Sequence, residues 1–251
     1  MNENWVLNGF FDAPKLTGLY EAAQRRVSCR SYAAAPTGEQ WNALLAAAES
    51  LALPGVRIVP GLCDNALFQP MMGLFMKFEN VQRYAAILAT DDRPESTVNA
   101  GVSGELFMLR AVGLGLAGCW VSGTFKRRQV SAGLRQNERL LAVLALGVPQ
   151  ADPQLPLTRK RKAPEAFCPD YAALPSALRE VVDYVRIAPS AMNMQPWRFA
   201  CDGQSLRLWV GAGAQRLDLG IALSHALLAL GSTPATFALD EDATGATLTL
   251  L

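Results

Sequence analysis

The hydrophobic and polar positions follow a helical period in some segments of the chain and form short apolar runs in others. Helical spacing of the apolar residues predicts five longer helices. These helices are expected over residues 17–26, 39–50, 98–116, 177–188 and 217–231. Apolar runs bounded by turn residues predict strands over 83–90, 117–123 and 139–147. The chain therefore mixes helices and strands throughout its length.

Turn and cap residues refine this pattern. Thr37 and Gln40 form a capping box that opens the helix over 39–50. Residues 197–210 are expected to form a hairpin with a type I′ turn at Asp202 and Gly203. A further helix is expected over 126–134, whereas 54–80 gives no clear element.

The string GLGLAG at 113–118 formally matches the glycine fingerprint of dinucleotide-binding folds. That fingerprint has to follow a strand and open a helix, whereas this string ends a predicted helix and opens a predicted strand. We therefore interpret it as a helix C-cap.

Two segments of the chain resemble each other. VNAGVSGELFMLRAVG at 98–113 aligns with LDLGIALSHALLALGS at 217–232, so that Asn99 matches Asp218 and Gly101 matches Gly220. A two-fold repeat of this kind indicates a fused dimer. We expect a first half over 1–150, a proline-rich and basic crossover over 151–176, and a second half over 177–251. The second half is expected to be truncated, without counterparts to the strands at 117–123 and 139–147.

Composition narrows the possible functions. The chain has 251 residues, is 51% hydrophobic and carries a formal net charge of +1 with acids and bases interspersed. With this balance of charges, no extended positive potential is expected that would attract nucleic acid or an anionic membrane. No signal pattern or membrane-spanning run is evident, and the five cysteines are scattered without a C-x-x-C pair, so a cytoplasmic protein is expected. His225 is the only histidine and lies in an apolar helix, so we expect a packed core residue and no metal site.

The string RRVSCRSY at 25–32 is a candidate anion site. Arg26, Ser28 and Arg30 alternate, so in an extended segment they point to one side and offer two guanidinium groups and a hydroxyl to one anion, such as a phosphate. Cys29 would point away from them. The alternative is a solvated basic turn, but the equivalent segment before residue 177 has no arginine.

A second motif, APSAMNMQPWRF at 188–199, places a polar corner between a helix and a strand. The corresponding corner of the first half, LALPGVRIVPG at 51–61, has none of its serine, asparagine and glutamine. One half thus holds the anion string and the other holds the polar corner, and together they predict one composite site.

The pattern R-x-S-x-R, followed later by A-P-S-A-x-N-x-Q-P-W-R-F, resembles the FMN-dependent nitroreductase family, and most similarly its single-chain, double-domain members. The resemblance implies an α+β nitroreductase-like fold with a central, mostly antiparallel sheet flanked by helices, in which the two halves form an intramolecular pseudo-dimer. Family members are usually homodimers with flavin between the subunits. A pseudo-dimer is compatible with a monomer.

The resemblance also implies residue roles around FMN. Arg26, Ser28 and Arg30 would hold the phosphate and the ring edge. The corner residues, Pro189, Ser190, Ala191 and Asn193, would lie against the flavin ring. Backbone at the reactive side of the ring would come from Val121, Ser122 and Gly123. Lys160 and Arg161 in the run RKRK would close over the phosphate, although a solvated loop is an equal alternative. Many family members have R-R-S-x-R where Val27 stands here, so one basic side chain is missing.

These roles imply an oxidoreductase that transfers a hydride from NADH or NADPH through FMN to a nitroaromatic or quinone-like acceptor in a ping-pong cycle. No catalytic acid or base is assigned, because the chemistry belongs to the flavin. Two alternatives stay open: a flavin-dependent dehydrogenase or tailoring enzyme that does not use NAD(P)H, and a degenerate flavin-binding protein. A lid over the acceptor, or a buried excursion, is expected within 60–80.

Overall fold

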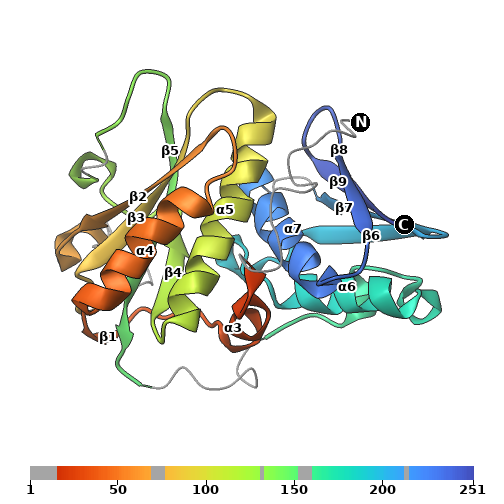
Figure 1. The fold of residues 1–251 in the computed structure, drawn as a ribbon, viewed down its shortest axis with the longest axis horizontal. Coiled ribbons are helices and arrows are strands. Elements are labelled where there is room, and N and C mark those ends of the chain that lie inside the picture. The colour runs from red at the N-terminus through yellow and green to blue at the C-terminus, as the bar shows by residue number, and fades with distance from the viewer. Residues whose placement is uncertain (1–15, 69–76, 131–132, 152–159, 212–214) are drawn as a thin grey trace.

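The structure is a computed structural model that describes residues 16–68, 77–130, 133–151, 160–211 and 215–251 (Figure 1). Two antiparallel sheets lie at opposite ends of the molecule, with helices between them. The expected α+β architecture of antiparallel sheets flanked by helices is confirmed. The part of the lid prediction that falls on 69–76 lies outside the described residues.

Within the described residues, the first half contains three α-helices and a five-stranded sheet. In chain order its elements are α3 (Leu19–Arg25), β1 (Tyr32–Ala34), α4 (Gly38–Ser50), β2 (Val56–Leu62), β3 (Arg83–Ala89), α5 (Pro94–Gly113), β4 (Ala117–Val121) and β5 (Arg139–Pro149). β3 lies between β2 and β5, and the other edge of β5 pairs with β4 and, at its end, with β1. All of these strand pairs are antiparallel.

The described part of the second half contains two α-helices and a four-stranded antiparallel sheet in the order β6-β7-β9-β8. Its elements are α6 (Ser176–Ile187), β6 (Trp197–Asp202), β7 (Ser205–Val210), α7 (Arg216–Leu230), β8 (Ala235–Leu239) and β9 (Gly245–Leu250). Both halves therefore run from helix through two strands to a helix and two more strands. Their strand orders, β2-β3-β5-β4 and β6-β7-β9-β8, correspond strand by strand.

This correspondence corrects one prediction. β8 and β9 take the places of the strands at 117–123 and 139–147, which we expected the second half to lack. Both strands are short, and threonine and alanine alternate with their few large apolar residues. Only one face of each strand is well buried, so neither shows the continuous apolar run of a central strand.

Two other local predictions are wrong. Residues 126–134 were expected to be helical, but only a 3₁₀ turn at Arg127–Gln129 forms there, and 131–132 lie outside the described part. The hairpin turn lies one residue later than predicted, because Asp202 pairs with Ser205. Gly203 then takes the first loop position with φ of 59°, and it alone of the two loop residues has a positive φ, which fits a type II′ turn.

The capping predictions are confirmed. Thr37 and Gln40 form both hydrogen bonds of the capping box. At the end of α5, Gly115 has φ of 81°, its N–H donates to Val112 O, and the N–H of Leu116 donates to Ala111 O. These two bonds define a Schellman C-cap, so the string at 113–118 ends a helix.

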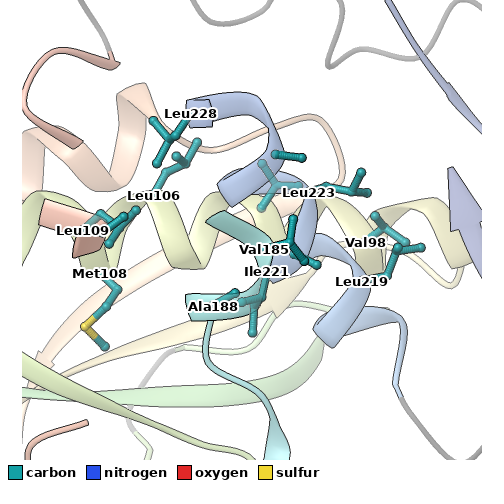
Figure 2. Packing of buried hydrophobic residues seen from close by; sticks show 14 of the residues in the cluster. Val98, Leu106, Met108, Leu109, Val185, Ala188, Leu219, Ile221, Leu223 and Leu228 are labelled. Atoms are coloured by element: carbon teal, nitrogen blue, oxygen red, sulfur yellow. The ribbon is translucent and has the colours of Figure 1, made fainter. Parts of the chain in front are cut away.

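α5 and α7 lie side by side between the two sheets (Figure 1). Side chains of both helices enter one hydrophobic cluster that spans the two halves. Figure 2 shows Val98 and Leu106 of α5 packed with Leu219 and Leu228 of α7, and Val185 of α6 beside them. The main core is therefore the contact between the halves, and the candidate site lies at its edge.

Candidate functional site

The segment that carries the predicted anion string runs beside β4. Ser28 forms a parallel bridge with Gly118, and the Cys29 N–H donates to Gly118 O at 2.9 Å. Cys29 packs against a second hydrophobic cluster on the far face of the first sheet, and this cluster also contains Cys119 of β4.

Arg26, Ser28 and Arg30 gather around one point of β4. Burial raises the pKa of the Cys119 thiol, and the guanidinium groups of Arg30 and Arg26 and the Ser28 side chain act in the opposite direction. Only Arg26 is buried, with 2% of its surface exposed, whereas Ser28 and Arg30 are exposed. The string thus provides one buried and one exposed guanidinium.

Arg26 points toward α5. Its Nε lies 3.6 Å from Oε1 of Glu105, which is fully buried. Oε2 of Glu105 accepts a hydrogen bond from Trp120 Nε1 at 2.7 Å, and Oε1 lies 3.1 Å from His225 Nε2 on α7. Neither Nε nor Nη1 of Arg26 has a hydrogen-bond partner. A buried guanidinium with unused N–H groups is costly unless an anion satisfies them.

The predicted polar corner has an unusual backbone. Met192, Asn193 and Gln195 have φ angles of 49°, 55° and 52°, in the left-handed region that residues other than glycine rarely adopt. The Asn193 N–H donates to Ser190 O at 3.0 Å, and the Gln195 N–H donates to Ser190 Oγ at 2.9 Å. Strained backbone of this kind persists only where its surroundings hold it, and it gathers at functional sites.

The basic segment after the crossover holds this corner. Arg161 donates from Nη1 to Asn193 Oδ1 and from Nη2 to Ile187 O, the latter at 3.1 Å. Asn193 in turn donates from Nδ2 to Lys160 O at 3.1 Å. The structure therefore joins Arg161 and Lys160 to Asn193 rather than leaving them in a solvated loop, although the Lys160 side chain is exposed.

α7 supports the corner from the other side. Asp218, in its first turn, accepts a hydrogen bond at Oδ1 from the Ala191 N–H at 3.1 Å. Burial raises the pKa of Asp218, and the N–H groups of Ala191 and Gln215 oppose that rise. Its repeat partner Asn99 makes a related bond in the first half, from Nδ2 to Pro54 O at 3.0 Å.

Three guanidinium groups from three parts of the chain meet here. Burial, and then the positive charges of Arg26 and Arg186, lower the pKa of Arg161 to about 10, while Glu105 acts in the opposite direction. Nε of Arg161 is also buried without a partner. Glu105 lies beside Arg26, and Asp183 Oδ1 lies 3.9 Å from Arg186 Nε. The three arginines still exceed these two carboxylates, and their unused N–H groups fit a phosphate or similar anion.

Residues 121–123, which were predicted to line the reactive side of the flavin ring, lie apart from the arginine cluster and the polar corner in their described contacts. The Val121 side chain is buried in the second cluster, and Ser122 O accepts a hydrogen bond from Arg127 Nη2 at 3.4 Å. A side chain at Gly123 would meet no atom within 4 Å. Their described contacts do not join these residues to the corner.

Sequence reasoning missed Glu105, Arg186 and the support from Asp218. Glu105 could have been noticed, because it is the only acidic residue of α5 beyond the first turn and lies in the apolar stretch GELFML. Trp197, at the start of β6, is fully buried. His225 is also buried as expected, with Nδ1 at 3.1 Å from Tyr184 O.

The described residues offer neither a cluster of metal ligands nor a membrane-spanning helix. No three histidine, cysteine, aspartate or glutamate side chains among them lie close enough together to hold a metal ion. In the same residues, no helix combines the length and apolar character needed to cross a membrane.

Comparison with protein-family models matches residues 18–230 to the family described as "Putative TM nitroreductase". Among solved structures, the crystal structure of a "putative nitroreductase" from Thermotoga maritima aligns with 93% of this chain and 94% of its own, at a TM-score of 0.68 and 20% identity. No curated protein sequence matches significantly.

Other solved structures match about half of the chain. An FMN-dependent nitroreductase from Clostridium difficile aligns with 59% of this chain and 97% of its own, with a TM-score of 0.46 and 15% identity. The NADPH:FMN oxidoreductase of Vibrio harveyi, complexed with NAD⁺, aligns with 59% of this chain and 74% of its own, with a TM-score of 0.41 and 19% identity.

Proposed function

The chain belongs to the nitroreductase family, and we propose that it is an FMN-dependent oxidoreductase. In this proposal NADH or NADPH supplies a hydride, and a nitroaromatic or quinone-like molecule accepts the electrons. The observation that carries the proposal is the buried guanidinium of Arg26, which has unused N–H groups beside Arg161 and Arg186.

The arginine cluster suits the phosphate of FMN, and the polar corner suits its ring. The arginine cluster would bind the phosphate through charge-assisted hydrogen bonds. The corner at 189–195 would orient the ring, because Arg161, Lys160 and Asp218 hold its strained backbone in a single conformation. Bound FMN would supply a ring that accepts a hydride at N5 and passes electrons on. The chain's own task is to fix that ring beside an open slot.

The site takes one part from each half of the chain. Arg26 comes from the first half, and Asn193 comes from the second. We propose that the halves stand in for the two subunits of a dimer, so that a monomer is sufficient. The reciprocal site would lack both parts, since residues 168–175, directly before α6, include no arginine and the corner after Pro54 has no equivalent of Ser190 or Asn193. One FMN per chain follows.

Flavin retention and reduction test this function directly. The purified protein is mixed with FMN, freed of excess, and examined by visible absorption before and after anaerobic addition of NADH or NADPH. We expect a retained flavin spectrum that bleaches with one or both nucleotides. Retained flavin that neither nucleotide bleaches would favour a dehydrogenase or tailoring enzyme that does not use NAD(P)H. Loss of flavin would contradict the proposal.

A ping-pong cycle makes a second, kinetic expectation. Donor and acceptor would use the same face of the ring in turn, so initial rates at several fixed acceptor concentrations should give parallel double-reciprocal lines. Intersecting lines would contradict the shared slot.

A further inference from the structure

Glu105 is a buried carboxylate beside the proposed phosphate site, yet it does not form a close pair with Arg26. Paired guanidinium and carboxylate groups usually approach to about 2.8 Å and form two parallel hydrogen bonds. Here the nearest atoms, Arg26 Nε and Glu105 Oε1, are 3.6 Å apart, and Nε has no hydrogen-bond partner. Something holds the two groups apart.

Both oxygens of Glu105 are engaged by other side chains. Trp120 Nε1 donates to Oε2 at 2.7 Å. On the other oxygen, His225 Nε2 lies 3.1 Å from Oε1. Trp120 belongs to β4 and His225 to α7, so the two contacts hold the carboxylate from opposite halves of the chain.

The geometry also fixes the role of His225. Nδ1 lies 3.1 Å from the carbonyl oxygen of Tyr184, which can only accept, so Nδ1 carries a proton. The contact between Nε2 and Glu105 then needs one more proton. The proton between Nε2 and Oε1 joins the two side chains, so His225 holds this oxygen of Glu105 in place.

We propose that Glu105 is a positioning residue that serves as the counter-charge of Arg26 when no anion is bound. Trp120 and His225 keep it from closing on the guanidinium, which leaves N–H groups free for the phosphate of an incoming ligand. The identity of that ligand as FMN rests on the proposed function, whereas the restraint of Glu105 does not. The negative charge of Glu105 stabilises the ligand-free protein, and the same charge lowers the affinity of Arg26 for the anion.

Glu105→Gln separates these two effects, because it removes the charge and keeps the shape. Without the competing carboxylate, anion affinity should rise by at least about fivefold, at the low end of typical couplings between sites. The ligand-free protein should melt at a lower temperature, because Arg26 loses its counter-charge. Glu95→Gln, in the first turn of the same helix, changes the net charge equally and is the matched control.

His225 supplies an opposite test. His225→Leu frees Oε1 to close on Arg26 and should weaken anion binding by at least about fivefold. Adding Glu105→Gln to that variant should restore the affinity of Glu105→Gln alone, because no carboxylate is left to compete. A purely structural defect would persist in the double variant. His225→Gln keeps an amide donor and should bind almost as the wild type does.

The experiment measures thermal stability against inorganic phosphate concentration and, separately, the dissociation constant for FMN. The predicted order of phosphate affinity is Glu105→Gln above wild type above His225→Leu. Equal or weaker phosphate binding by Glu105→Gln, or no phosphate effect on any variant, would overturn the proposal. If Glu105→Gln does not fold, the two His225 variants carry the test. Phosphate effects in the predicted order without FMN binding would contradict the proposed function alone.

Discussion

Gly101 in α5 and Gly220 in α7 face each other where the two helices cross, and each accommodates the other's backbone. A Cβ atom on Gly101 would lie 2.3 Å from Leu217 O, and one on Gly220 would lie 2.0 Å from Val98 O. Val98 and Leu217 are themselves equivalent in the repeat. The contact is therefore reciprocal, as at the interface of a symmetric dimer.

Gly101→Ala should destabilise the protein by about 3 kcal/mol or more, because the new methyl group collides with backbone that cannot move aside easily. Gly220→Ala should have the same effect for the same reason. Urea unfolding measures both. Gly113→Ala in α5 is the control: a Cβ there meets no atom within 4 Å, so stability should stay unchanged or rise by up to about 1 kcal/mol.

Arg26→Gln should weaken FMN binding by roughly ten- to a hundredfold, the value of one or two charge-assisted hydrogen bonds. The adjacent Arg25 is exposed, so Arg25→Gln should change the affinity less than about twofold. Quenching of flavin fluorescence gives both dissociation constants. Similar losses in the two variants would show that general positive charge, rather than the buried guanidinium, attracts the flavin.

Asp218→Ala should loosen the polar corner. It removes the acceptor for the part-buried Ala191 N–H, and loss of such a hydrogen bond costs about 1 kcal/mol. Unfolding should become easier by that amount, and FMN affinity should fall with it. Asn99→Ala removes the related bond to Pro54 O in the first half. It should lower stability and leave the FMN dissociation constant unchanged, which separates support of the site from support of the fold.

Arg161 predicts a pH dependence of anion binding. Its pKa is lowered to about 10, so its charge is lost as the pH rises through that value. Stabilisation by inorganic phosphate should be constant from about pH 8, where phosphate is mainly a dianion, to about pH 9, and should decline above it. The Arg161→Gln variant should bind phosphate more weakly at neutral pH and lack this decline.

The lowered pKa of Arg161 also affects folding stability, which changes with pH in the opposite direction to phosphate binding. The unfolded chain binds the Arg161 proton more tightly than the folded chain does, so this residue's contribution to stability rises with pH through about 10. The difference in unfolding free energy between wild type and Arg161→Gln isolates the effect. A difference that stays flat between pH 8 and 11 would contradict the burial of Arg161 beside the positive charges of Arg26 and Arg186.

Much of the fold could be predicted because its central elements have strong periodic patterns. α5, α7, β3 and β5 are almost entirely buried, and their apolar residues fix element type from the sequence alone. β2 could not be predicted, because Pro60 and Gly61 interrupt its pattern. These two residues are tolerated on β2 because it is an edge strand of its sheet.

The candidate site shows a similar division. The alternation of Arg26, Ser28 and Arg30 and the polarity of the corner could be read locally. The meeting of Arg26 with Glu105, and of Asn193 with Arg161, joins residues 79 and 32 positions apart. No local pattern encodes such contacts, because they depend on how α3, α5 and the crossover pack together.

The stoichiometry of FMN binding tests the central claim most directly. If only one of the two possible composite sites is complete, each chain binds a single FMN. Calorimetric titration of FMN into purified protein, together with the mass of the protein in solution, gives the number of flavins per chain. We predict one FMN for each 251-residue chain. Two per chain would show that the second site is also complete, and none would show that the arginine cluster serves another anion.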